Sequence, residues 1–287
     1  MTMIDNSLLM ALDAFATYGT LSAAAEKLHT SQPALTRSMK KLEEELGVSL
    51  FIRSKNHLEL NDTGLHAAEY AKQALSANRD FEIKVRAYDR SLNTISIGFC
   101  APVPQTVFTP ILNSVFEGMT ISADMTDDIH FLEKLIDGTY QLAVVHEEPI
   151  DSVFYYKKCG HEDLFVSLDP SNPLTFYPEI HLKDLDGLSI LLLQRIGFWS
   201  RMHREKTPNS NYLVQVEFDS LQELSKGSTY PAFASSYYIK RGEVHPGKVN
   251  IPIVDPECHT DYFLVCLQEN ASKYEKLFSR VNDKTIL

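Results

Sequence analysis

Apolar residues in the first part of the chain recur at a spacing typical of amphipathic helices. Leu8, Leu12 and Phe15 lie three or four positions apart, so residues 5–18 are predicted to form a helix with one buried face. A second helix is predicted over Leu21–Leu28, where consecutive alanines leave room for a neighbouring helix to approach. These segments predict a small, closely packed helical unit.

The next segment predicts a third helix followed by a β-hairpin. Ser31 can cap this helix, and Pro33 fits its first turn, where a missing N–H costs nothing. Two short strands are predicted over residues 48–52 and 58–60, with a hairpin tip at 53–57. The predicted buried face of the third helix consists of Leu35, Met39, Leu42 and Leu46. Three helices and a hairpin are the parts of a winged helix-turn-helix.

Exposed side chains make the third helix a candidate DNA reader. Gln can pair with adenine, Arg with guanine, and Thr can meet a thymine methyl group or a phosphate. The hairpin would act as a wing against the DNA backbone or the minor groove. Candidate DNA-binding residues are Ser31, Gln32, Pro33, Thr36, Arg37, Lys40 and, in the wing, Arg53. Taken singly, each of them could equally be a solvated side chain of a helical hairpin.

A long amphipathic helix is predicted next, from its cap at Asn61 to about Tyr88. Its apolar stripe comprises Leu65, Ala68, Ala71, Leu75, Phe81, Val85 and Tyr88. Because this helix has no core of its own to cover, packing on a symmetric partner is expected, which predicts a dimer. Packing on its own domain is the alternative.

From Thr94 onward, short apolar runs alternate with helical segments. The first set is strand 95–99, helix 110–116, strand 121–125, helix 131–136 and strand 142–146. The second set has strands at 163–168, 188–193, 213–218, 232–235 and 261–267, a helix at 220–225 and a closing helix at 273–281. Strands that alternate with helices predict α/β lobes with parallel sheets.

The N-terminal string is specific enough to identify a family. Its main segments are Gly19-Thr20-Leu21-Ser22-Ala23-Ala24-Ala25, Ser31-Gln32-Pro33-Ala34-Leu35-Thr36-Arg37 and Leu42-Glu43-Glu44-Glu45-Leu46-Gly47. Together they closely resemble the signature of LysR-type transcriptional regulators. The resemblance implies that Gln32, Pro33, Thr36 and Arg37 meet DNA and that Arg53 is the wing arginine. Ala23 and Thr30 are mild departures, since a polar and an aliphatic residue are usual there.

The resemblance also implies the fold: an α/β protein with an N-terminal all-α winged helix-turn-helix and a two-lobed, Rossmann-like effector domain, similar to periplasmic binding proteins. The expected domains are 1–60 for DNA binding, 61–91 for the dimerising linker helix and 92–287 for the effector. Lobe I is expected at about 92–160 and 266–287, and lobe II at about 161–265. The expected function is effector-controlled, sequence-specific regulation on double-stranded promoter DNA, as a homodimer or homotetramer, with RNA polymerase as a further partner.

In two-lobed folds of this kind, ligands lie in the cleft between the lobes, at the ends of strands. The loops expected to face that cleft supply the candidate effector-binding residues Pro102, Gln105, Thr106, Asp128, Phe198 and Trp199. A carboxylate that faces aromatic rings favours a polar or cationic effector over an anionic one. The alternative is that Asp128 caps a helix and Trp199 belongs to the core.

The net charge of −11 at first argues against nucleic acid, and residues 1–90 are nearly balanced, with 11 basic and 12 acidic side chains. Local clustering matters more than the total, because phosphates are met by one face of the protein. A short stretch contains Arg37, Lys40, Lys41, Arg53 and Lys55. The acidic remainder is expected to limit indiscriminate binding.

Cysteine usage and missing motifs narrow the function classes. Four dispersed cysteines do not make a disulfide scaffold, but a redox switch between Cys258 and Cys266 would make the chain a thiol-based regulator of the same family, which is the alternative function. The sequence contains no phosphate loop, nucleophile elbow or zinc-protease motif, so no enzyme activity, cofactor or metal is expected.

The start of the chain lacks a signal-peptide pattern, and no apolar run is long enough to span a membrane. We therefore expect a cytoplasmic protein, and a solute-binding protein is only a remote alternative.

Overall fold

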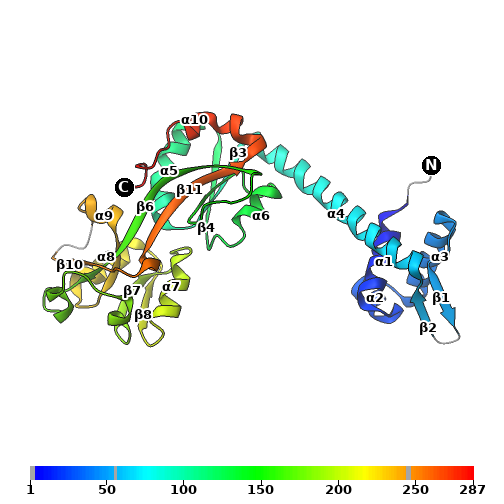
Figure 1. The fold of residues 1–287 in the computed structure, drawn as a ribbon, viewed down its shortest axis with the longest axis horizontal. Coiled ribbons are helices and arrows are strands. Elements are labelled where there is room, and N and C mark those ends of the chain that lie inside the picture. The colour runs from blue at the N-terminus through cyan, green and yellow to red at the C-terminus, as the bar shows by residue number, and fades with distance from the viewer. Residues whose placement is uncertain (1–3, 55–56, 244–246) are drawn as a thin grey trace. The chain divides into compact units, whose positions relative to one another are not determined.

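The computed structural model describes residues 4–54, 57–243 and 247–287, in two compact units that divide between Arg86 and Ala87. Figure 1 shows the smaller unit as helices with a hairpin and the larger unit as α/β structure, which confirms the predicted fold class. Lys55 and Asn56 of the predicted wing tip lie outside the described residues. Within the described ranges, no helix combines the length and apolar character needed to cross a membrane.

The smaller unit has the parts of a winged helix-turn-helix. They are α1 (Asn6–Tyr18), α2 (Leu21–Lys27), α3 (Gln32–Leu46) and the antiparallel strands β1 (Phe51–Ser54) and β2 (His57–Leu60). Each helix begins at a side-chain cap, provided by Asp5, Thr20 and Ser31 in turn. Leu35, Met39 and Leu42 are buried as predicted, whereas Leu46 is exposed, because α3 ends there and nothing covers it.

Helix α4 (Asp62–Ser91) leaves the smaller unit and continues into the larger one. It begins where the side-chain oxygen of Asn61 accepts the backbone N–H of Gly64 at 2.8 Å. Ala68 and Ala71 pack on the helical core of the smaller unit. Other large apolar side chains of α4 are exposed, namely Leu65, Tyr70, Phe81, Val85 and Tyr88. The apolar stripe predicted for this helix is therefore buried in part in the core of the smaller unit and exposed in part at the surface.

Lobe I of the larger unit is built on a parallel sheet with strand order β4-β3-β5. Its elements are β3 (Thr94–Phe99), α5 (Pro102–Val115), β4 (Thr120–Met125), α6 (Phe131–Ile136) and β5 (Leu142–Val145). Helix α5 begins at Pro102, well before the predicted start at residue 110. Prolines 102 and 104 lie in its first turn, where the backbone N–H is not needed, so they start the helix instead of delaying it.

Lobe II has a second parallel arrangement, β8-β7-β9. Its elements are β7 (Ser189–Leu193), α7 (Trp199–Lys206), β8 (Asn211–Gln215), α8 (Phe218–Gly227), β9 (Ala232–Ser235), α9 (Ser236–Lys240) and β10 (Val249–Pro252). Phe198 and Trp199, predicted in a turn, are the N-cap and first residue of α7. The start of this helix is held against lobe I, because the N–H of Phe198 donates to the carbonyl of Cys100 at 2.9 Å.

Two long antiparallel strands, β6 (Phe154–Leu168) and β11 (His259–Leu267), run through both lobes. β11 pairs with β5 of lobe I, and β6 pairs with β9 and β10 of lobe II, so one sheet extends over the whole unit. The ladder between them has a bulge at Cys159, since Tyr262 pairs with Gly160 and Phe263 with Lys158. The lobes therefore meet at this bulge.

Two predicted boundaries in this region are wrong. Strand β6 starts at Phe154 and not at Asp163, because pairing with β11 extends it backward through lobe I. The closing segment is a 3-10 turn over Gln268–Tyr274 followed by the short α10 (Glu275–Phe278), and not one helix over 273–281. Both differences come from pairing and packing partners that are distant in sequence.

Candidate nucleic-acid interface and ligand cavity

The N-terminal end of α3 presents the predicted DNA-reading side chains. Gln32, Pro33 and Arg37 are exposed, and the half-buried Thr36 donates its hydroxyl to the carbonyl of Gln32 at 2.9 Å. The side-chain oxygen of Gln32 accepts a hydrogen bond from the hydroxyl of Ser22 at 3.3 Å, which orients the amide. Arg37 has no ion-pair partner in the part of the chain that the structure describes. Its guanidinium is therefore available to a base or a phosphate.

The other two predicted basic contacts already have partners. Lys40 lies 3.9 Å from Glu44, in an exposed pair that contributes little. Arg53 donates to one carboxylate oxygen of Glu43 at 2.7 Å, and the other oxygen accepts the N–H of Leu50 at 2.8 Å. Burial raises the pKa of Glu43, but these hydrogen bonds outweigh burial and hold it below its ordinary value. Arg53 of the wing is thus bonded to Glu43 of α3, and only the remaining N–H groups of the Arg53 guanidinium can face DNA.

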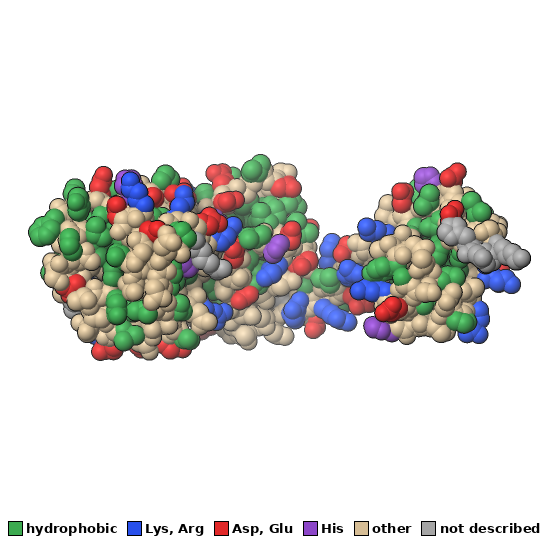
Figure 2. All heavy atoms as spheres, turned by 90° about the horizontal axis from the view of Figure 1, so that it is seen from below, with side chains coloured by type: hydrophobic (Ala, Val, Ile, Leu, Met, Phe, Trp, Pro, Cys, Tyr) green, Lys and Arg blue, Asp and Glu red, His purple; other side chains and the backbone are tan. Residues whose placement is uncertain are grey.

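The remainder of the chain offers no general attraction to phosphate. Residues 91–287 carry 16 basic and 26 acidic side chains. On the face of the larger unit drawn in Figure 2, acidic and basic side chains are interspersed. The candidate nucleic-acid interface is therefore confined to the smaller unit.

A groove of about 560 Å³ lies between α1 and α4 of the smaller unit. Met10 and Tyr18 of α1 line it, and so does Leu75 of α4, together with polar residues that include Lys72 and Arg79. Met10 and Tyr18 are 47% and 43% exposed. A groove with large apolar side chains open to solvent can receive the apolar face of another helix.

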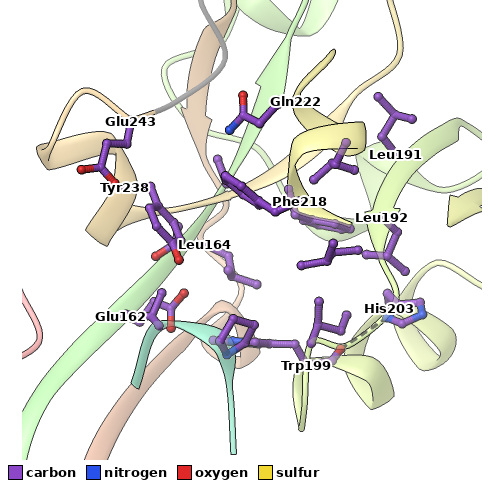
Figure 3. Close-up of a pocket in the computed structure, with 18 of the residues that line it drawn as sticks. Glu162, Leu164, Leu191, Leu192, Trp199, His203, Phe218, Gln222, Tyr238 and Glu243 are labelled. Atoms are coloured by element: carbon purple, nitrogen blue, oxygen red, sulfur yellow. Dashed lines mark hydrogen bonds between the residues drawn. The ribbon is translucent and has the colours of Figure 1, made fainter. Parts of the chain in front are cut away.

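A cavity of about 130 Å³ lies in the larger unit beside β6, between the start of α5 and lobe II (Figure 3). Its apolar lining includes Pro102, Val103, Leu164, Leu191, Leu192, Leu193, Phe218, Leu221 and Phe233. Its polar lining consists of Glu162, His203, Gln222, Ser235, Glu243 and the polar atoms of Trp199 and Tyr238. A largely apolar cavity with a few convergent polar groups is typical of small-molecule sites.

Glu162 of β6 is the most deeply buried polar residue of this lining, at 2% exposure. The hydroxyl of Tyr262 on β11 donates a hydrogen bond to its carboxyl group. Burial raises the pKa of Glu162 to about 7, although hydrogen bonds from Tyr262 and Ser235 act in the opposite direction. The buried indole N–H of Trp199, in the same wall, falls outside ordinary hydrogen-bond geometry but interacts with the carboxyl group of Glu162 and also lowers its pKa.

The structure distributes the six predicted effector residues over four positions, and four of these residues lie at or near the cavity. Pro102 and Trp199 line the cavity. Thr106 lies beside it, with its hydroxyl 3.2 Å from that of the lining residue Tyr238. Gln105 lies half-buried on α5 outside the lining. Pro102, Trp199 and Thr106 therefore lie at or next to one site.

Asp128 and Phe198 do not line the cavity, and the structure gives them another role. A carboxylate oxygen of Asp128 lies 2.6 Å from Nδ1 of His146 and accepts that residue's backbone N–H at 3.1 Å. The ring of Phe198 stacks on His146 with centroids 4.0 Å apart. Nearby, Arg201 of lobe II pairs with Asp127 of lobe I at 3.1 Å. We call Asp127, Asp128, His146, Phe198 and Arg201 the interlobe latch. Asp128 thus lies at the contact between the lobes and outside the lining of the cavity, and its binding of an effector stays a prediction.

Sequence reasoning missed Glu162, although a signal was present. Inward-facing residues of a strand alternate, and the even-numbered positions of β6 from Gly160 through Glu162, Leu164 and Val166 to Leu168 are all buried. A carboxylate in this apolar register is unusual and marks a site. The predicted strand began at residue 163, which removed Glu162 from the pattern.

The cysteines oppose the redox alternative. All four are buried, and Cys258 and Cys266 stand at opposite ends of β11. Eight steps of about 3.3 Å along a strand separate them by roughly 26 Å, whereas a disulfide needs Cα atoms within about 7 Å. Burial raises the pKa of both thiols to about 12, which disfavours the reactive thiolate. In the described ranges, no three His, Cys, Asp or Glu residues are grouped to hold a metal ion.

Comparisons with known proteins agree with this arrangement. Residues 7–65 match the model of the bacterial regulatory helix-turn-helix protein, lysR family, and residues 90–281 match the LysR substrate binding domain. The chain is 27% identical over 188 residues to the HTH-type transcriptional regulator ClcR of Pseudomonas putida, covering 64% of each chain. It is 30% identical over 181 residues to the regulator YtlI of Bacillus subtilis, covering 58% of this chain and 56% of that protein.

The matched stretch thus spans less than two thirds of either of these relatives. Among solved structures, a full-length OxyR variant from Pseudomonas aeruginosa is similar at a TM-score of 0.50 and 18% identity, covering 99% of this chain and all of that one. At this identity the likeness concerns the fold alone.

Proposed function

The chain belongs to the LysR family of bacterial regulatory helix-turn-helix proteins, and on that basis we propose that it regulates transcription by binding promoter DNA. Helix α3 enters the major groove, the β1–β2 wing contacts the DNA backbone, and a small molecule in the cavity adjusts DNA binding. The observation that carries the proposal is the exposed guanidinium of Arg37, without an ion pair among the described residues, next to the oriented amide of Gln32. Such a regulator works in the cytoplasm and controls RNA polymerase. Both relatives are named as regulators, and no catalytic function is proposed.

The proposal includes a symmetric dimer. Its support is the apolar surface of α4 at Phe81 and Val85, together with the groove that Leu75 and Met10 line. A two-fold dimer presents two copies of α3 to half-sites about one helical turn apart, roughly 34 Å. Pairing of dimers into tetramers through the larger unit extends the proposal on the family resemblance.

The DNA target can be identified by selection from random sequence. The full chain is used to select duplexes from a random-sequence library, and the enriched duplexes are sequenced. We expect an inverted repeat, because a two-fold dimer reads the same sequence in both half-sites. Enrichment of no motif would contradict the proposal.

Arg37→Ala tests the readout on the selected duplex. We expect affinity to fall by about 1–3 kcal/mol per half-site contact, roughly 5- to 150-fold, with an unchanged melting temperature because the side chain is exposed. Arg195→Ala, which removes an exposed arginine of the larger unit, is the control and should bind like the unaltered chain. Equal affinity of both variants in a mobility-shift titration would remove Arg37 from the readout.

A further inference from the structure

The lining of the cavity carries negative charge but no strong cation. Glu162 and Glu243 are its carboxyl groups, and its described residues include neither lysine nor arginine. The imidazole of His203 lies 3.3 Å from the carbonyl of Trp199, so part of its hydrogen-bonding capacity is used. A ligand carboxylate placed here would face like charge without a counter-ion. The charge of the lining therefore disfavours anions.

The groups packed around Glu162 do not supply a positive charge either. The titratable groups are Tyr262 from β11, Tyr238 from α9, Cys100 after β3 and Asp163 on the same strand, and the neutral side chains of Ser235 and Trp199 also interact with the carboxyl group. Each of them is neutral or negative, so the ionised Glu162 is a buried carboxylate without a counter-ion among the described residues. Such a group is unfavourable unless a cation reaches it. The hydrogen bonds that Glu162 receives from Tyr262, Ser235 and Trp199 come from neutral donors and only partly offset burial, since its pKa still lies at about 7.

The opposite side of the cavity is shaped for an apolar body. Figure 3 shows Leu191 and Leu192 across the cavity from Glu162. The rings of Phe218 and Tyr238 lie 5.8 Å apart in the same lining and offer π faces to a cation. The volume of about 130 Å³ is close to that of an engineered cavity of about 150 Å³ that binds benzene. The space therefore fits a body of about one six-membered ring.

We propose that this cavity binds a small primary amine, with its ammonium group against Glu162 and a ring-sized apolar body against the leucines of β7. The inference rests on the proposed function, since it names the chemical class of the effector for that site. In this proposal the carboxyl group that meets the ligand is Glu162 and not Asp128. Glu162 lines the cavity and has no cationic partner among the described residues.

Three probes of the same shape and different charge test the proposal on the full chain: benzylamine, benzyl alcohol and benzoate. Titration calorimetry should show benzylamine as the tightest binder at pH 8, with the millimolar affinity usual for so small a molecule. Because burial raises the pKa of Glu162 to about 7, its ionised fraction falls about tenfold between pH 8 and pH 6. The ammonium stays protonated over this range, so benzylamine affinity should fall by about the same factor, while benzyl alcohol affinity should not fall.

Two variants test whether Glu162 is the carboxyl group that binds the amine. Glu162→Gln keeps the shape of the side chain and should bind benzylamine about tenfold more weakly, with no remaining pH dependence. Benzyl alcohol should still bind to this variant, which shows that its cavity is formed. Glu179→Gln removes an exposed carboxyl group of lobe II outside the lining, and as the matched control it should keep both the amine preference and the pH dependence.

Three results would overturn the inference: tighter binding of benzoate than of benzylamine, unchanged amine binding by Glu162→Gln, or no benzylamine binding at any concentration that the protein tolerates. None of them affects the duplex selection or the Arg37 titration. Failure of those DNA experiments would overturn the proposed function while leaving amine binding as an independent property of the cavity.

Discussion

At the scale of single residues, Gly197 occupies a position that only glycine fits. Its φ is +62°, and an added Cβ would lie 1.8 Å from the carbonyl oxygen of Cys100. That close approach allows the N–H of Phe198 to reach the same carbonyl. One residue without a side chain thus holds the start of α7 against the end of β3, next to Trp199 of the cavity wall.

Gly197→Ala should therefore destabilise the larger unit more than Gly242→Ala. Gly242 also has a left-handed φ, +69°, but nothing lies within 4 Å of its added Cβ. We expect about 1 kcal/mol for Gly242→Ala from backbone strain alone, and roughly 3 kcal/mol or more for Gly197→Ala, because the backbone must also move. Urea denaturation followed by circular dichroism measures both, and equal losses would show that the steric contact is unimportant.

Residues with local roles were predictable, and residues with distant partners were not. Thr20 and Ser31 cap helices through N–H groups three residues away, which is visible in the sequence. Asp128 is hydrogen-bonded to His146, which follows it by 18 residues just after β5, and this partner is not visible in the sequence. Glu162 depends on a register set by β11, about one hundred residues away. Local capping can be read from one sequence, whereas pairing across a sheet cannot.

At the scale of elements, α4 has two different surfaces. Its alanines at 68 and 71 belong to the core of the smaller unit, and its later aromatic and aliphatic residues are exposed.

The helices of the smaller unit match prediction closely, because caps, Pro33 and Gly47 fix their ends locally. The length of β6 is set by its partner strand, so its predicted start was wrong.

Leu75→Lys should weaken the proposed dimer. Leu75 lines the α1–α4 groove, so in a two-fold assembly the change places two like charges in the buried seam. We expect the dissociation constant to rise by about 100-fold or more, equal to roughly 3 kcal/mol. Light scattering after size-exclusion chromatography measures the mass. Gln73→Lys adds the same charge to an exposed position of α4 outside the groove and should remain dimeric. An unaltered chain that is monomeric at micromolar concentration would contradict the assembly.

At the scale of the whole molecule, each unit carries a separate part of the proposed function. The smaller unit holds the exposed end of α3, and the larger unit holds the cavity and the interlobe latch. Within the larger unit, the lobes contact each other through the latch, the Thr106–Tyr238 hydroxyl pair and the Phe198–Cys100 hydrogen bond. The two-lobed architecture was predictable from alternating strands and helices, but these contacts are set by tertiary structure.

The His146–Asp128 and Arg201–Asp127 contacts of the latch should differ in their contribution to stability. His146→Ala removes the imidazole that lies 2.6 Å from the carboxylate of Asp128, which is 6% exposed, together with the stacking on Phe198, and leaves only the backbone N–H of residue 146 as a donor to that carboxylate. We expect a loss of roughly 1–3 kcal/mol. Arg201→Ala removes an ion pair that is 46% and 28% exposed, and less than about 1 kcal/mol should be lost. Thermal unfolding of the two variants compares them. A larger effect of Arg201→Ala would mean that the exposed pair dominates the contact between the lobes.

The strands that run through both lobes also determine which motion can open the cavity. A hydrogen-bonded two-stranded ribbon resists stretching and shearing, because either motion would break several of its bonds at once. It rotates more easily at a bulge, where one residue is left out of the ladder, as at Cys159. The lobes are therefore expected to have one soft torsional degree of freedom about the axis of β6 and β11. A ligand that fills the cavity would change the angle by which one lobe is rotated against the other about this axis. That rotation alone would couple ligand binding in lobe II to a movement of lobe I, which α4 joins.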